Sequence, residues 1–130
     1  MTARQQEYEA WLKYADDDLK AAEELIKAGL YNVACFHSHQ AAEKFLKAFL
    51  VKRKINPPRI HKLPTLVSLC EEIAPDFQQL KSDALILDMY YISTRYPNAP
   101  VGSLPEGLPN EEDALKALDI AKRIRDFIWS

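Results

Sequence analysis

Glycine, cysteine and long apolar runs are scarce in this chain, and each scarcity excludes a class of protein. Three glycines among 130 residues form no phosphate-cradling loop, and no Gly-x-Ser-x-Gly or His-Glu-x-x-His motif occurs, which argues against familiar kinase, hydrolase and zinc-enzyme sites. The two cysteines, Cys35 and Cys70, belong to no metal-binding pattern, so we expect free, partly buried thiols. Neither a bound metal nor a cofactor is expected.

The amino terminus is polar and charged, without the apolar segment of a signal peptide. No apolar run approaches the length needed to cross a bilayer. We therefore expect a cytoplasmic protein that makes no contact with a membrane.

Size and charge limit the organisation and the partners of the protein. A chain of 130 residues and 14.9 kDa is predicted to form one domain, residues 1–130, that buries most of its apolar surface. The net charge of -2 argues against a surface built as a whole for nonspecific nucleic-acid binding. A local basic groove remains compatible with that total.

Apolar residues recur at steps of three and four through most of the sequence, and no convincing alternating strand pattern is present. The pattern predicts helices over about 5–28, 31–53, 64–74, 76–96 and from 110 to the carboxyl end, with prolines at the breaks. The expected fold is all-α, an antiparallel up-and-down bundle of four to five helices. Gly29 is expected to end the first helix, and Asn32 and Asn110 to cap the second and the last.

Two polar stripes stand out on the predicted helices. Gln40, Glu43 and Lys47 recur at helical spacing inside an otherwise apolar segment, so they share one face. The same spacing occurs in the fourth helix, where the stripe consists of Asp88, Tyr91 and Arg95. The two stripes are expected to face one another across a groove of the bundle.

Three groups of residues resemble the HEPN domain, named for higher eukaryotes and prokaryotes nucleotide-binding. They are Phe36, Gln40-Ala41-Ala42-Glu43-Lys44, Leu46-Lys47-Ala48 and Leu50; then His61-Lys62-Leu63 with Leu66; and finally Arg95-Tyr96-Pro97. The resemblance covers nearly the whole chain and implies a bundle of four or five helices that often dimerises. It also implies pairing with a small nucleotidyltransferase encoded beside it, in systems thought to act as toxin and antitoxin.

The sequence departs from one large division of that family, the metal-independent RNases. Members of that division are marked by an Arg followed four to six residues later by a His, whereas no histidine follows Arg95 in this chain. The usual acid or base for attack by a ribose 2'-hydroxyl is therefore missing from its place. We expect a module that binds a nucleotide or phosphate and is not itself a catalyst.

The expected ligand is an ATP-like nucleotide or RNA, held in the groove between the two stripes. The candidate binding residues are Gln40, Lys44, Lys47, His61, Asp88, Tyr91 and Arg95. Two alternatives stay open: a metal-independent RNase that uses Arg95 with a non-standard histidine, His61, and a purely structural dimerisation module. Ordinary structural roles, such as a Glu43 to Lys47 helix pair, also stay open.

A homodimer is expected because Phe36, Phe45, Phe49 and the tyrosines offer more apolar surface than one polar stripe can conceal. A specific interface typically buries about 800 Å² on each partner, which one helix pair could supply. The proline-rich segment from Pro97 to Pro109 is long for a small domain, so it is a candidate lid or contact surface.

Overall fold

The computed structural model describes residues 1–95 and 108–129, with the side chains of residues 92–95 left outside that description. It contains α1 (Ala3–Lys27), α2 (Tyr31–Lys52), α3 (Leu63–Ile73), the 3₁₀ turn η1 (Pro75–Leu80), α4 (Lys81–Arg95) and α5 (Glu111–Trp129). Over the described residues there is no strand, so the predicted all-α class is correct. Most of the Pro97 to Pro109 segment lies outside the described residues.

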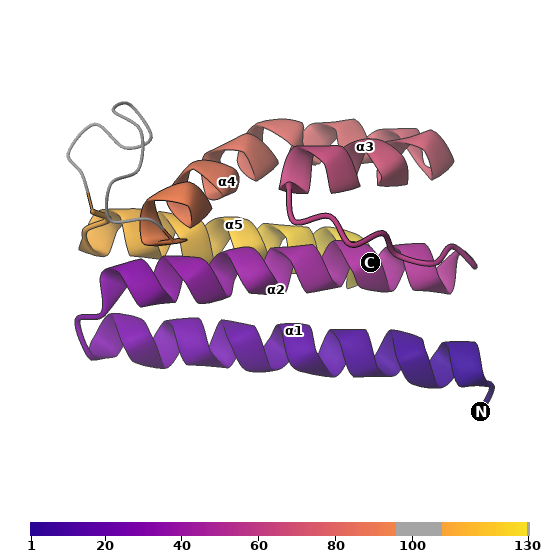
Figure 1. Cartoon of the computed structure of the whole chain (residues 1–130), viewed down its shortest axis with the longest axis horizontal. Coiled ribbons are helices and arrows are strands. Elements are labelled where there is room, and N and C mark those ends of the chain that lie inside the picture. Colours follow the sequence, from indigo (N-terminus) through magenta and orange to yellow (C-terminus); the bar gives the residue numbers. More distant parts are fainter. Residues whose placement is uncertain (96–107, 130) are drawn as a thin grey trace.

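The four long helices α1, α2, α4 and α5 alternate in direction, which makes the fold an up-and-down bundle (Figure 1). Helix α2 is central and contacts α1, α3, α4 and α5. The segment that follows α2 runs back along it before α3 begins, so α3 and α2 point the same way (Figure 1). This return path brings residues near 61 alongside the middle of α2.

The core is built on α2, and its largest fully buried side chains there are Phe45, Leu46 and Leu50. Phe49 packs on Phe77 with ring centroids 4.5 Å apart, so it also faces the interior of the bundle. Much of the aromatic surface from which we predicted a dimer is therefore buried within one chain. The homodimer stays a prediction, and among the tyrosines counted for it Tyr14 is 59% exposed.

Two helices end with the same pair of backbone hydrogen bonds, the Schellman motif. At the end of α1, Leu30 N donates to Leu25 O at 2.9 Å and Gly29 has a φ of 77°. At the end of α2, Ile55 N donates to Leu50 O at 2.9 Å, and the left-handed residue is Lys54, with a φ of 69°. The left-handed Gly29 was predicted, whereas the left-handed Lys54 was not.

The predicted cap of α2 was wrong and that of α5 was correct. Because Leu30 serves in the Schellman motif and its carbonyl accepts from Ala34 N at 3.0 Å, α2 begins at Tyr31 and Asn32 already lies inside it. Asn110 caps α5 as predicted, since its Oδ1 accepts from Asp113 N at 2.9 Å.

The fourth predicted helix is divided in two. Residues Pro75–Leu80 form the 3₁₀ turn, and the α-helix starts at Lys81. The buried side chains in the turn are Phe77 and Leu80, spaced three apart, which fits the three residues per turn of a 3₁₀ helix. The core therefore favours the tighter geometry there.

Both thiols are free, as predicted, and they are fully buried where partial burial was expected. Burial raises the pKa of the Cys35 thiol to about 12, with a smaller contribution from Asp113. Burial alone raises the pKa of the Cys70 thiol to about 12. The hydroxyl of Tyr90 is also buried, and burial raises its pKa to about 12, with Asp113 again adding to the shift.

None of the helices in the described ranges is both long and apolar enough to cross a membrane. Within the same residues, no group of three or more His, Cys, Asp or Glu side chains is arranged to hold a metal ion.

Candidate functional site

All three histidines of the chain bond to carboxylates, and helix α2 contributes to each pairing. The Asp18 cluster contains Asp18, His37 and Lys44; the Glu43 cluster contains Glu43, Lys47 and His61; the Asp88 cluster contains His39, Asp88 and Tyr91. Two histidines come from α2 itself, while His61 comes from the segment between α2 and α3. The three clusters differ in burial, and this difference separates structural roles from a candidate ligand site.

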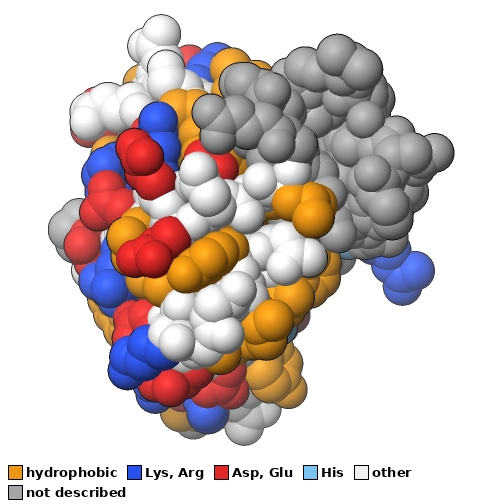
Figure 2. Space-filling view, turned by 90° about the vertical axis from the view of Figure 1, so that its left-hand side faces the viewer, with side chains coloured by type: hydrophobic (Ala, Val, Ile, Leu, Met, Phe, Trp, Pro, Cys, Tyr) orange, Lys and Arg blue, Asp and Glu red, His pale blue; other side chains and the backbone are white. Residues whose placement is uncertain are grey.

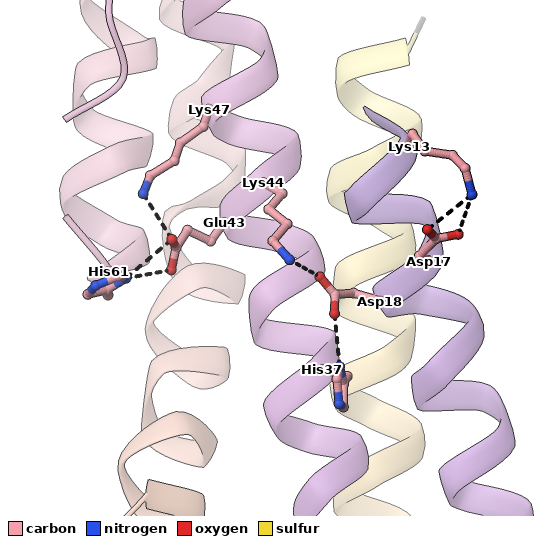
Figure 3. Close-up of polar contacts among 8 residues, drawn as sticks. All are labelled: Lys13, Asp17, Asp18, His37, Glu43, Lys44, Lys47 and His61. Atoms are coloured by element: carbon pink, nitrogen blue, oxygen red, sulfur yellow. Dashed lines mark hydrogen bonds and ion pairs between the residues drawn. The ribbon is translucent and has the colours of Figure 1, made fainter. Parts of the chain in front are cut away.

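The Asp18 cluster joins α1 to α2. His37 Nδ1 lies 2.8 Å from Asp18 Oδ1, and Lys44 Nζ donates to the other oxygen of the same carboxylate (Figure 3). His37 and Lys44 are seven residues apart on α2, which places both on the face toward α1. Lys44, a predicted ligand residue, therefore has a carboxylate partner inside a contact between helices.

The Glu43 cluster places an ion pair inside the bundle and a histidine at its edge. Lys47 Nζ lies 2.9 Å from Glu43 Oε2, and their side chains are only 7% and 6% exposed. His61 Nδ1 lies 3.1 and 3.2 Å from the two Glu43 oxygens, and the His61 side chain is 61% exposed (Figure 3). When Nδ1 donates its proton to Glu43, the exposed Nε2 accepts a hydrogen bond in the neutral ring and donates one in the imidazolium, which is the form that can bind a phosphate oxygen.

The ammonium of Lys47 has a second partner in α1. It lies 5.8 Å from the centroid of the Trp11 ring, within the range of a cation–π contact. A buried Lys–Glu pair gains from such additional partners because both charges have lost their water. Lys47 is thus held in place and in turn fixes the carboxylate that orients His61.

The Asp88 cluster is the most enclosed of the three. His39 is fully buried, and its Nε2 lies 2.8 Å from Asp88 Oδ1. The same oxygen accepts from the backbone N of Leu63 at 3.2 Å, which is the first amide of α3 and has no partner within its helix. The ring of His39 also stacks on Tyr91, with centroids 4.1 Å apart. These contacts fix α3 and α4 against α2.

The predicted residues are brought together in part. Lys47 meets His61 through Glu43, and Asp88 meets Tyr91 through His39. The two groups join along the chain, because His61 lies two residues before the amide that Asp88 accepts. Gln40 is half-buried, and its Oε1 is buried without a hydrogen-bond partner in the described part of the chain.

Arg95 ends α4, and its side chain lies outside the description. Its backbone register is informative, because α4 runs antiparallel to α2 with Asp88 beside His39. Lys47 and Arg95 lie in opposite directions from that contact, so their backbones are about 20 Å apart along the bundle at 1.5 Å per residue. The sequence suggested that they were neighbours, but this register separates them by more than one phosphate can bridge.

The sequence interpretation gave no ligand role to Glu43, and it did not connect Asp18 or His39 to any partner. A signal existed for Asp18, because it occurs between Ala15 and Ala22 at steps of three and four, on the buried face of α1. No comparable pattern identifies the pairing of His61 with Glu43. It depends on the path of the segment between α2 and α3.

Comparison with known proteins identifies the family. The HEPN domain model matches residues 8–129, from α1 to the end of α5. The chain belongs to the HEPN family. No curated protein matches it.

Two solved structures share the fold of this HEPN domain. TT1696 from Thermus thermophilus is 32% identical, with a TM-score of 0.78, and the match covers 94% of this chain and 95% of that one. ST0689, an archaeal HEPN homologue, is 30% identical, with a TM-score of 0.74 and a coverage of 94% of both chains. The likeness therefore extends over the whole bundle and is not limited to one helix pair.

Proposed function

We propose that this HEPN domain binds the phosphate of a nucleotide or of RNA beside His61 and acts as the partner of a small nucleotidyltransferase. One observation carries the proposal: His61 is 61% exposed, while the carboxylate that orients it is 6% exposed. An exposed imidazole with one nitrogen fixed presents the other to a ligand in a defined direction. Membership of the HEPN family supports the ligand class.

The remaining predicted residues take graded roles in this proposal. Lys47 positions Glu43, and Asp88 holds the first amide of α3. Tyr91 stacks on His39, which bonds Asp88, so all three support His61 indirectly. Lys44 belongs to the side of α2 that faces α1, where it bonds Asp18, and Gln40 lies one turn before it on the same helix. Arg95 supplies a cation at the end of α4, far enough from His61 that the two contact different phosphates or different parts of one ligand.

Equilibrium titration with ATP and with a short RNA tests the proposal. The variants His61→Ala and Arg95→Ala should each weaken binding about tenfold or more, because a charge-assisted hydrogen bond contributes about 1.5–3 kcal/mol. Lys13→Ala is the matched control, since Lys13 is 68% exposed and pairs with Asp17 on α1. Absence of binding to either ligand by the unaltered protein contradicts the proposal.

The proposed protein partners are a small nucleotidyltransferase and a second copy of this chain. Leu85 on α4 and Leu115 on α5 are 58% and 49% exposed, which leaves apolar surface for such contacts. Co-expression with a nucleotidyltransferase from the neighbouring reading frame should give a complex that copurifies. A stable dimer that ignores both the nucleotidyltransferase and nucleotides would instead support a purely structural dimerisation module.

A second function, metal-independent RNA cleavage, is favoured by the contact between Glu43 and His61. A carboxylate that orients an imidazole is the arrangement of a general base, here able to take the proton of a ribose 2'-hydroxyl as it attacks the adjacent phosphorus. As the 2'-oxygen bonds to phosphorus, the P–O5' bond breaks and the imidazolium returns its proton to the departing 5'-oxygen. Arg95, at the end of α4, would bind another phosphate of the same strand. This activity would replace the missing downstream histidine with a residue from another segment.

Cleavage of single-stranded RNA in the presence of a chelator tests this second function. His61→Ala and Arg95→Ala should each abolish cleavage, and a 2'-deoxy substitution at the cleaved nucleotide should block it in the unaltered protein. Activity that is the same in both variants would end the RNase hypothesis and leave the binding proposal intact.

A further inference from the structure

A run of unpaired positive charge begins at the last residue of helix α2 and continues beyond it. We call residues 52–62 the basic connection; they contain no acidic residue, and their exposed cations are Lys52, Arg53, Lys54, Arg59 and Lys62. Within the described residues none of these five forms an ion pair. The connection therefore concentrates positive charge in a chain whose net charge is -2.

Most of the described lysines and arginines elsewhere have carboxylate partners. Lys13, Lys20, Lys27, Lys44, Lys47, Lys81, Lys122, Arg123 and Arg125 each lie within 3.4 Å of a carboxylate oxygen. Figure 2 shows the end of the bundle opposite the end of α2, where acidic and basic side chains are interspersed over one side. Mixed charge of this kind is an ordinary solvated surface. The residues of the basic connection carry charge of one sign, and Glu7 of α1 is the carboxylate that lines the hollow beside Lys54.

The backbone at Lys54 points to a role other than stability. A left-handed residue with a side chain costs about 1 kcal/mol or more relative to glycine, and the equivalent position after α1 is Gly29. Such strain persists where a side chain serves a function. At Lys54 it places an ammonium group at the turn between α2 and the basic connection.

Aromatic rings and prolines hold the connection in shape. Lys52 Nζ lies 5.6 Å from the centroid of Tyr8, and Arg53 Cζ lies 5.6 Å from that of Phe49. Pro57 and Pro58 restrict the backbone that follows. Less conformational entropy is then lost on binding than for a free loop.

The charges are too widely spread for one mononucleotide. His61 contacts Glu43 of α2. Lys52 lies nine residues after Glu43 on that helix, which is about 13 Å along its axis. A chain of phosphates can contact cations over that distance, as in the positively charged grooves that follow a single strand. A protein interface would need an apolar centre, yet Ile55 is the one large hydrophobic residue of residues 52–62 that is exposed.

We propose that the basic connection binds the phosphate backbone of a single-stranded polynucleotide, with RNA as the expected form, and leads it to His61. The inference rests on the proposed function for its ligand class and adds the surface that binds it. Beside Lys54, a hollow of about 190 Å³ is lined by Ala3, Arg4, Glu7, Val51, Lys54, Ile55 and Asn56. The hollow extends the surface to the start of α1.

The test measures binding of a fluorescent 20-nucleotide oligo(U) by anisotropy over a range of salt concentrations. The triple variant Lys52→Gln, Arg53→Gln, Lys54→Gln should bind at least tenfold more weakly, and the slope of log K against log salt should fall by about 2. The matched control is Lys20→Gln, Lys27→Gln, Lys122→Gln, which lowers the net charge by the same three units at ion-paired sites. It should keep the slope of the unaltered protein.

The outcomes separate this inference from the proposed function. An equal loss of oligo(U) binding in both triple variants overturns the inference, because only net charge would then matter. ATP binding that persists while oligo(U) does not bind also overturns it, and leaves the proposed function standing. Equal binding of oligo(U) and oligo(dT) supports the phosphate surface and assigns it to either nucleic acid. If the unaltered protein binds neither ATP nor oligo(U), both proposals are removed.

Discussion

The connections after α1 and after α2 begin with the same hydrogen bonds and differ in almost everything else. The first, residues 28–30, is Ala-Gly-Leu, carries no charge, and uses Gly29 in the left-handed position. The second, residues 52–62, puts Lys54 in that position, carries five exposed cations, and ends beside the Glu43 cluster. One connection is optimised for a tight turn, whereas the other accepts strain and unpaired charge.

The comparison indicates where stability and function are separated in this HEPN domain. The buried contacts of Asp18 and Asp88 hold helices together and leave little surface for a ligand. The second connection bonds to a carboxylate of the bundle through His61, which contacts Glu43, and its cations are exposed. We therefore expect changes in the first connection to alter folding, and changes in the second to alter binding.

Alkaline pH should produce the largest loss in the free energy of unfolding, because the helix that follows each connection contains a buried thiol. Cys35 is in the first turns of α2, and Cys70 is in α3, beyond the basic connection. Each thiol has a pKa of about 12 in the folded chain and 9.0 in the unfolded chain. The two thiols therefore lose their protons at a lower pH when the chain is unfolded. Stability is complete below pH 9 and falls by roughly 1 kcal/mol per pH unit for each group, up to pH 12.

Chemical denaturation between pH 8 and pH 11 measures this loss, to which Tyr90 adds above pH 10. Cys35→Ala and Cys70→Ala should each flatten the fall in stability by a similar amount, whatever their stability at pH 8. Flattening by only one of the two variants would show that the two connections belong to separately unfolding parts of the bundle.

Removal of Asp88 should give the next largest effect and should act on the second connection alone. Asp88→Ala leaves His39 buried without a hydrogen-bond partner and the first amide of α3 uncapped, which we expect to cost about 2–4 kcal/mol. Thermal unfolding at pH 7 measures the cost. The control beside the first connection is Tyr31→Phe, which removes a 3.1 Å bond to the exposed Glu111 and should cost about 1 kcal/mol or less. Equal costs would show that Asp88 does not anchor α3.

The sequence predicted the helices well because their pattern is local, and it predicted the site only in part. Apolar periodicity, Gly29 and Asn110 are features of short segments, whereas the pairs that form the site join residues far apart in the chain. His61 was identified as a candidate, but its partner Glu43 depends on an extended segment with no periodicity to reveal its path. The cations of the basic connection could be counted in the sequence. That they form no ion pairs appears only once the structure places the carboxylates.

The smallest effects should have opposite signs at the two left-handed positions. Gly29→Ala places a side chain at a φ of 77°, which should cost about 1 kcal/mol by strain alone, since no atom lies within 4 Å of the added Cβ. Lys54→Gly relieves the same strain and should stabilise the protein by up to about 1 kcal/mol. Chemical denaturation measures both, and a gain in Lys54→Gly accompanied by weaker oligo(U) binding would mean that the lysine is kept for its ligand. A gain in stability with unchanged binding would remove Lys54 from the proposed surface, because its strain would then have no counterpart in function.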